Sequence, residues 1–123
     1  SLHICRSTDS DKTGHAYRLA KEVLPKEKTN RVIVLGDFNN NMGDTAMNML
    51  EASGYKPSWK DLEIDVSKEF TYNALDPKYN SGVIDHILYS NFLDTKVIDG
   101  GIIELKKPLS DHKPVWAELA FPR

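Results

Sequence analysis

A run of apolar and mostly β-branched residues, VIVL at positions 32–35, constrains the fold more than any other feature of the sequence. Such an uninterrupted run is typical of a strand that is covered on both faces. The run ends at Gly36 and Asp37, within the stretch LGDFNNNMG. A strand covered on both faces needs a helix or a second sheet on each side, so the run predicts a layered α/β domain.

The rest of the chain alternates helical and strand patterns at first and is dominated by strand patterns later. A helical stripe that ends at Pro25 is formed by Ala16, Leu19, Ala20, Val23 and Leu24. A second helix is expected from a cap at Asp44 to about Ser53, with Gly54 after it. Further strands are expected at residues 2–5, 83–89, 95–105 and 115–121. No linker or internal repeat divides this α/β domain.

Length and composition fit one domain of 123 residues with 40% hydrophobic residues. The net charge of -2 lacks the basic excess of most nucleic-acid surfaces, although a local basic patch is compatible with it. Cys5 is the only cysteine, so the redox compartment stays open. The sequence has no apolar run of membrane-spanning length and no signal peptide at its start. It begins at Ser1 in a strand-like pattern, so we expect a piece of a longer chain whose localisation is undetermined.

Polar residues follow or interrupt the expected strands at three places. These are Asp37 and Asn39 in GDFN, Asp85 in VIDHIL, and Asp111 with His112 in LSDHKPV. A charged group in a buried strand is costly unless it is paired or bound to a metal. Taken singly, an Asp-x-Asn is more often a turn and a histidine more often structural. Together they predict a cleft with carboxylates for a divalent metal and a histidine that moves a proton or binds phosphate.

A calcium-binding EF-hand loop is the competing interpretation of the GDFNNN stretch. Asp37, Asn39 and Asn41 occupy the first, third and fifth positions of such a loop. The sixth position requires glycine and holds Met42, and the twelfth requires glutamate and holds Asn48. A strand pattern precedes the loop where an EF-hand has a helix. These three differences exclude the EF-hand.

The ordered motifs GDFN, IDHIL and SDHKPV resemble the endonuclease/exonuclease/phosphatase family of metal-dependent phosphoesterases. The opening SLHIC is similar to a family strand that ends in a catalytic histidine, so the resemblance extends from His3 to the C-terminus. It implies a DNase I-like, four-layer α/β sandwich with a mixed, mostly antiparallel sheet flanked by helices. The family fold has two similar halves, and residues 1–123 resemble only the C-terminal half.

The resemblance implies a catalytic role for five residues: His3, Asp37, Asn39, Asp85 and His112. By this likeness Asp37 orients or deprotonates the attacking water, and Asn39 binds the scissile phosphate. His112 contacts a phosphoryl oxygen or acts as acid and base, while Asp85 fixes its tautomer and raises its pKa. His3 is expected to be a second catalytic or phosphate-binding histidine.

A metal ligand and a cofactor are implied in the same way. Asp111 is expected at the divalent metal, which would be Mg²⁺ or Mn²⁺. The family's first half carries an Asn and a metal-binding Glu, and this sequence does not contain them. The metal site and one sheet face are therefore expected to be incomplete, so the isolated chain would be inactive and would associate with the missing half or with itself.

The predicted function is a divalent-metal-dependent hydrolase that cleaves a phosphodiester or phosphomonoester by direct water attack. Whether the substrate is a nucleic acid or a lipid headgroup stays open. The alternative is a non-catalytic binding or assembly module that retains the fold. The enzyme is favoured because a binding-only descendant has no reason to keep all five of the residues Asp37, Asn39, Asp85, Asp111 and His112.

Four other residues receive weaker predictions. His86 should point to the face opposite Asp85 and serve as a packing or rim residue. Trp116 is expected to pack beneath the last strand, whereas Trp59 is either a core residue or a substrate contact. Tyr72, in the stretch FTYN, lies where related enzymes bring a loop towards the substrate.

Overall fold

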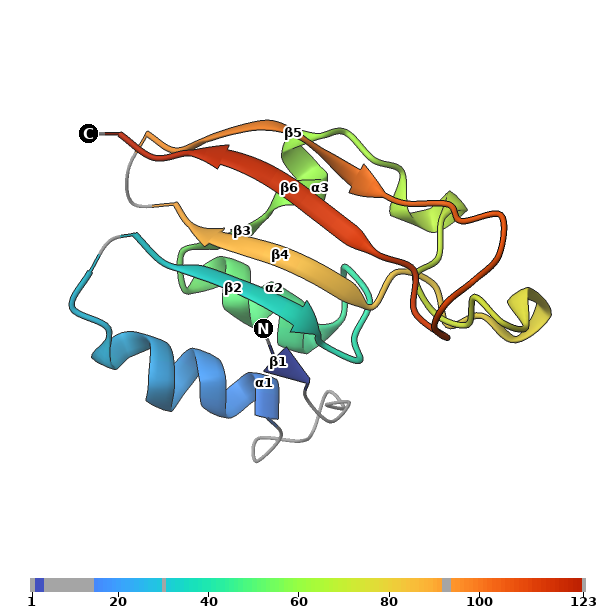
Figure 1. Ribbon diagram of the computed structural model, residues 1–123. Coiled ribbons are helices and arrows are strands. Elements are labelled where there is room, and N and C mark those ends of the chain that lie inside the picture. Colours follow the sequence, from blue (N-terminus) through green and yellow to red (C-terminus); the bar gives the residue numbers. More distant parts are fainter. Residues whose placement is uncertain (1, 4–14, 30, 92–93, 123) are drawn as a thin grey trace.

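Two sheets form the framework of residues 2–3, 15–29, 31–91 and 94–122, which this computed structural model describes. The first sheet has the strand order β1-β2-β4-β3, and its strands span Leu2–His3, Ile33–Asp37, Asp85–Ser90 and Tyr55–Pro57. β1 pairs with β2 in parallel, and the other pairings are antiparallel. The second sheet is an antiparallel hairpin of β5 (Lys96–Ile102) and β6 (Val115–Ala120), which packs above the first sheet (Figure 1).

The helices are short. One helical segment is built from α1 (His15–Arg18), a π turn η1 (Leu19–Val23) and a 3-10 turn η2 (Leu24–Lys26). The others are α2 (Thr45–Ala52), α3 (Ser58–Asp61) and the 3-10 turns η3 (Val66–Lys68) and η4 (Pro77–Tyr79). No helix among the described residues is long and apolar enough to cross a membrane.

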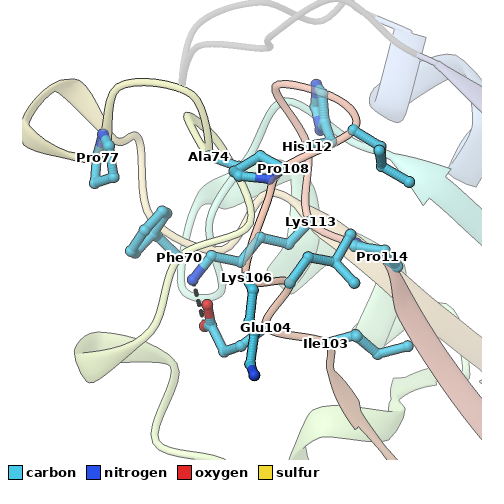
Figure 2. A pocket seen from close by; sticks show the side chains of 12 residues that line it. Phe70, Ala74, Pro77, Ile103, Glu104, Lys106, Pro108, His112, Lys113 and Pro114 are labelled. Carbon is cyan, nitrogen blue, oxygen red and sulfur yellow. Dashed lines mark hydrogen bonds and ion pairs between the residues drawn. The ribbon is translucent and has the colours of Figure 1, made fainter.

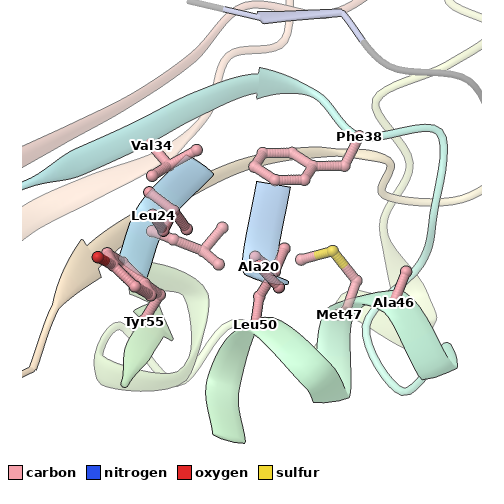
Figure 3. Close-up of a cluster of buried hydrophobic side chains, with 9 residues drawn as sticks. Ala20, Leu24, Val34, Phe38, Ala46, Met47, Leu50 and Tyr55 are labelled. Carbon is pink, nitrogen blue, oxygen red and sulfur yellow. The ribbon is translucent and has the colours of Figure 1, made fainter. Parts of the chain in front are cut away.

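A hydrophobic core fills the space between the helical segment, α2 and one face of the four-stranded sheet (Figure 3). Its buried members are Ala20, Leu24, Val34, Phe38, Ala46, Met47, Leu50, Tyr55 and Leu88. The prediction that Val23 belongs to this face was wrong, since its side chain is 50% exposed. The turn at Leu19–Val23 is π-helical, with i→i+5 hydrogen bonds and therefore more residues per turn than an α-helix. A hydrophobic face predicted from 3.6 residues per turn is therefore displaced at this turn.

The caps of α2 differ in part from the prediction. Asp44 occupies the N-cap position but makes no side-chain hydrogen bond to the helix. Its carboxylate instead accepts the backbone N–H of Asn41 at 2.8 Å, which closes the preceding loop. Gly54 follows the helix with φ +95°, the left-handed conformation that the C-terminus of a helix favours.

A second core lies between the other face of the sheet and the hairpin. Trp59, Val83 and Ile87 are buried there, and the flanking hydrophobic residues are Leu62, Ile64, Val66, Ile102, Val115, Ala117 and Leu119. Trp59 is fully buried and donates its indole N–H to the backbone oxygen of Asp85 at 3.2 Å, so it is a core residue. The prediction for Trp116 was wrong: this side chain is 41% exposed.

The prediction that both faces of β2 are covered was also wrong. Val34 is buried against the helices, but Ile33 and Leu35 on the opposite face are 43% and 38% exposed. The hairpin contacts β4 and leaves this part of β2 open. The expected class, α/β with a mixed and mostly antiparallel sheet flanked by helices, is confirmed.

Candidate active site

Three strands bring the first candidate residues to one end of the sheet. In the backbone register, His3 of β1 lies beside Asp37 of β2, and Asp37 lies opposite Asp85 of β4. The side chain of His3 is outside the described part of the structure, so its catalytic role stays a prediction. Residues that lie directly opposite in adjacent strands project to the same face. The two carboxylates therefore project together from the end of the sheet.

Asp85 and His112 form a hydrogen-bonded pair. Nδ1 of His112 lies 2.8 Å from Oδ2 of Asp85, and Nε2 lies 3.6 Å from Oδ2 of Asp37. An ionised Asp85 accepts the Nδ1 proton, which fixes the tautomer and turns Nε2 towards Asp37. The expected partnership between Asp85 and His112 is thus present in the structure.

The environment shifts the pKa of both members of this pair. Burial raises the pKa of Asp85, and hydrogen bonds from His112 and Thr71 oppose that effect. For His112, burial lowers the pKa, but the hydrogen bond to Asp85 and the charges of Asp85, Asp37 and Asp111 outweigh it. The net pKa of His112 is raised, which favours the imidazolium form near neutral pH.

The GDFN loop presents Asn39 beside Asp37. The backbone N–H of Asn39 donates to Oδ1 of Asp37 at 2.8 Å, and Asn39 has a left-handed φ of 49°. Asparagine tolerates this conformation better than most residues. Asp-x-Asn can therefore be both a structural turn and a functional motif, because the turn sets the position of Asn39.

Thr71 connects the segments that carry Asp85 and His112, a role that sequence analysis did not identify. Its fully buried hydroxyl accepts the backbone N–H groups of Ile84 and Asp85 at 3.0 and 3.2 Å and hydrogen-bonds the Asp85 carboxylate. Its backbone oxygen accepts the N–H of Lys113 at 2.8 Å. A single buried threonine in an irregular stretch shows no periodicity, so no sequence pattern identifies it.

Asp37, Asn39 and His112 lie at the wall of a cavity of about 470 Å³. It is lined by Asp37, Asn39, Asn41, Tyr72, Ser81, Ile84, Asp111 and His112. The ring of Tyr72 lies 5.0 Å from the His112 ring, so Tyr72 does border the candidate site. Asn41 donates its side-chain N–H to the backbone oxygen of Ser81 at 2.8 Å, which connects the GDFNNN loop to the segment before β4.

Comparison with known proteins is consistent with this arrangement of motifs. The model of the endonuclease/exonuclease/phosphatase family matches residues 2–112. The chain belongs to this family. No curated protein matches the chain in sequence.

A solved structure supports the fold of this endonuclease/exonuclease/phosphatase family member. The mannosyl-6-phosphatase Bt3783 of Bacteroides thetaiotaomicron VPI-5482 is similar over 98% of the present chain, with a TM-score of 0.65 and 24% sequence identity. The similarity covers 49% of that protein, so the present chain spans about half its length. The expected DNase I-like fold class and the expected family are confirmed.

The donor atoms of the site fit a divalent cation at the carboxylates rather than at the imidazole. One ligand atom each of Asp37, Asp85 and His112 lies within 4.8 Å of the others. Asp85 and His112 are already bonded to each other, and Mg²⁺ prefers oxygen ligands. Asp37, Asn39 and Asp111 offer oxygen atoms along the same cavity. Coordination by Asp111 stays a prediction.

His86 supports the loop that carries Asn39, although it takes no part in the cavity. It is fully buried, as predicted for a packing residue, and its Nε2 lies 2.7 Å from the backbone oxygen of Asn40. Burial lowers the pKa of His86 to about 4, although the Asn40 oxygen and the charges of Asp37 and Asp44 act in the opposite direction. The imidazole is therefore neutral in the folded protein at neutral pH, and its Nε2–H donates to Asn40.

This lowered pKa predicts acid sensitivity of the fold. The unfolded chain binds a proton at His86 near pH 6.5 and the folded chain only near pH 4, so stability falls as pH falls between these values. The free energy of unfolding should lose up to about 3 kcal/mol over this window from His86 alone. Urea unfolding of the chain and of His86→Gln, at pH 6.5 and pH 4, measures the loss. An equal pH dependence in both proteins would contradict the assignment.

A second hollow, of about 220 Å³, lies beside the loop that carries His112 (Figure 2). His112 lines this hollow as well as the cavity that Asp37 and Asn39 line, so it lies between the two. Nζ of Lys113 lies 3.4 Å from the centre of the Phe70 ring and 2.5 Å from Oε1 of Glu104. A cation held between an aromatic face and a carboxylate anchors the residue after His112 to its neighbours.

Proposed function

We propose that this chain carries one half of the active site of a divalent-metal-dependent phosphoesterase. The observation that carries the proposal is the Asp85–His112–Asp37 arrangement at the wall of a polar cavity. Hydrolysis of a phosphate ester needs a positioned water and hydrogen-bond donors for the charged oxygens more than it needs a covalent nucleophile. Family membership supports this reaction class.

Each described residue has a defined part in the proposed reaction. Asp37 orients and deprotonates the attacking water, since its carboxylate lines the cavity. The side chain of Asn39 donates to a phosphate oxygen, and the Nε2–H of protonated His112 donates to another or to the leaving oxygen. Asp85 keeps the Nδ1 proton in place, so that Nε2 is the nitrogen directed to the substrate.

The proposed metal would be Mg²⁺ or Mn²⁺, held by Asp111 and neighbouring oxygen donors. When bound, it neutralises charge on the phosphate and lowers the pKa of water. Two carboxylates and an amide at one cavity are a sparse set for a cation that takes six ligands. We therefore propose that residues 1–123 form the C-terminal half of the catalytic domain and that a further half supplies the missing ligands.

The substrate is proposed at the level of a phosphate monoester or diester. The similar Bacteroides protein is named a mannosyl-6-phosphatase, which makes a mannosyl 6-phosphate one candidate. A nucleic acid and a phospholipid headgroup are the others. The net charge of -2 gives no preference for a polyanion.

The test compares this chain with the complete protein, meaning the natural polypeptide that contains the chain together with its completing half. Both are assayed with p-nitrophenyl phosphate, bis-p-nitrophenyl phosphate and mannose 6-phosphate, with Mg²⁺ or with EDTA. We expect EDTA-sensitive hydrolysis by the complete protein and none by the isolated chain.

Three results would contradict parts of this proposal. Hydrolysis that EDTA leaves unchanged would argue against the metal. Turnover by the isolated chain that disappears in Asp37→Ala would show that the half is sufficient. Absence of turnover in the complete protein, together with binding of inorganic phosphate, would favour a non-catalytic binding module.

A further inference from the structure

The hollow of about 220 Å³ beside the loop that carries His112 has no part in the reaction described above, and most of its wall is apolar. We call it the apolar hollow. Its wall includes Phe70, Ile103, Leu105 and Leu109 (Figure 2). An apolar cavity of about 150 Å³ accepts a benzene ring, so this hollow has room for a ring or a short alkyl group.

The apolar hollow meets the polar cavity at His112, which lines both. Carboxylate, amide and hydroxyl side chains form most of the wall of the polar cavity. Nε2 of His112 lies 3.6 Å from Oδ2 of Asp37, so this nitrogen faces the polar side. A phosphate bound at Nε2 would therefore lie next to the imidazole that also borders the apolar hollow. The organic group esterified to that phosphate would be within reach of the hollow.

The buried cation of the hollow is already neutralised. The side chain of Lys113 is only 8% exposed, and its Nζ lies 2.5 Å from Oε1 of Glu104 and 3.4 Å from the centre of the Phe70 ring. A second anionic group of a substrate would have to displace the Glu104 carboxylate to reach it. The other lysine of the wall, Lys106, is exposed to solvent. The hollow therefore favours an apolar group over a second phosphate.

A sugar fits the hollow poorly because hydroxyl groups need hydrogen-bond partners when they are buried. Among the described residues, the buried side-chain atoms without a partner belong to Asn40, Ser58, His86 and Thr95, and none of these residues lines the hollow. The hydroxyl groups of a sugar would lose water there and find few protein partners in return.

Backbone hydrogen bonds hold the two loops that form the hollow. The N–H of Ala74 donates to the backbone oxygen of Asp111 at 2.7 Å, and the N–H of Lys113 donates to that of Thr71 at 2.8 Å. These bonds join the wall of the hollow to the segment that carries His112. A cavity whose walls are held in this way binds a ligand without the cost of ordering them.

We infer that the apolar hollow is a specificity site for the organic part of the substrate, and that this part is a short alkyl or aryl group. The inference rests on the proposed function, because that function places the phosphate in the neighbouring polar cavity. It also ranks the candidate substrates. An ester with an apolar group beside the phosphate should be preferred to mannose 6-phosphate.

Binding of alkylphosphonates to the complete protein tests the hollow without requiring turnover. The carbon–phosphorus bond is not cleaved by ester hydrolysis, so ethylphosphonate and hexylphosphonate report affinity alone. Each methylene that becomes buried should tighten binding about fourfold. Hexylphosphonate should therefore bind about 10²-fold more tightly than ethylphosphonate, measured by isothermal titration calorimetry with Mg²⁺.

Two variants locate this preference in the hollow. Ala74→Leu places a larger side chain in the wall and should lower the ratio of the two affinities at least tenfold. Its matched control is Ala52→Leu, the same change at an exposed residue at the end of α2 that does not line the hollow, which should keep the parental ratio. Leu109→Ser removes apolar wall at a side chain that is 86% exposed, so it should lower the ratio without affecting folding.

Equal affinity for the two phosphonates would overturn the inference, as would a ratio that neither Ala74→Leu nor Leu109→Ser lowers. Release of phosphate from ethyl and hexyl phosphate distinguishes this failure from failure of the proposed reaction. Turnover of both esters with equal kcat/KM would overturn the specificity site alone. Tight binding of hexylphosphonate without turnover of either ester would contradict the proposed reaction and support the specificity site.

Discussion

Replacing Asp37 with Asn in the complete protein is expected to lower kcat by about 10²–10⁴-fold, the contribution that a positioned general base makes. The substitution keeps the size of the side chain and the oxygen that accepts the N–H of Asn39 at 2.8 Å. It removes the negative charge that lies 3.6 Å from Nε2 of His112. The loss should therefore appear in turnover under saturating substrate, measured with the best ester found in the substrate comparison.

A matched variant separates chemistry from folding. Asp65→Asn makes the same charge change at an exposed residue of the η3 cap, away from the cavity, and retains the oxygen that accepts the N–H of Ser67. This variant should keep its turnover within about twofold, since surface substitutions of this kind have small effects. Asp37→Asn with turnover equal to that of Asp65→Asn would remove Asp37 from the reaction.

The motif residues were predictable because each lies next to an apolar strand: Asp37 ends β2, Asp85 begins β4 and His112 precedes β6. Asp37 and Asp85 end up opposite each other because β2 and β4 pair in antiparallel register. His112 precedes β6, the strand that packs on β4, and this packing brings it to Asp85. Hydrophobic patterning thus determined which polar residues meet, even where exact distances could not be foreseen.

Other features could not be predicted because they depend on contacts between irregular segments. Thr71 forms hydrogen bonds with backbone groups of two distant segments, and no spacing in the sequence predicts these contacts. The exposure of Leu35 was missed for a different reason. An apolar run indicates that a surface is to be buried, but it does not say whether the covering element belongs to the same 123 residues.

Replacing Asp85 with Asn is the second change with a large expected effect. Asn can donate from its amide to Nδ1 of His112, which favours the wrong tautomer, and a loss of about 10³-fold in kcat/KM is expected. The hydrogen bond and charge of Asp85 are the main factors that raise the pKa of His112, against the opposing effect of burial. Their removal lowers this pKa, so the protonated form is lost at a lower pH. The alkaline limb of the activity profile should therefore move to lower pH.

Variants of Thr71 test whether the position of Asp85 matters, because Thr71 hydrogen-bonds Asp85 but does not line the cavity. Thr71→Val removes a hydroxyl that accepts the N–H groups of Ile84 and Asp85, whereas Thr71→Ser retains it. Activity should fall about tenfold in the valine variant and stay near the parental value in the serine variant, because buried N–H groups without an acceptor displace the carboxylate.

A parental pH profile in Asp85→Asn would show that Asp85 does not control the protonation of His112. Equal activity of the two Thr71 variants would show that the hydroxyl does not position Asp85, and the carboxylate would then be held by the strand register alone.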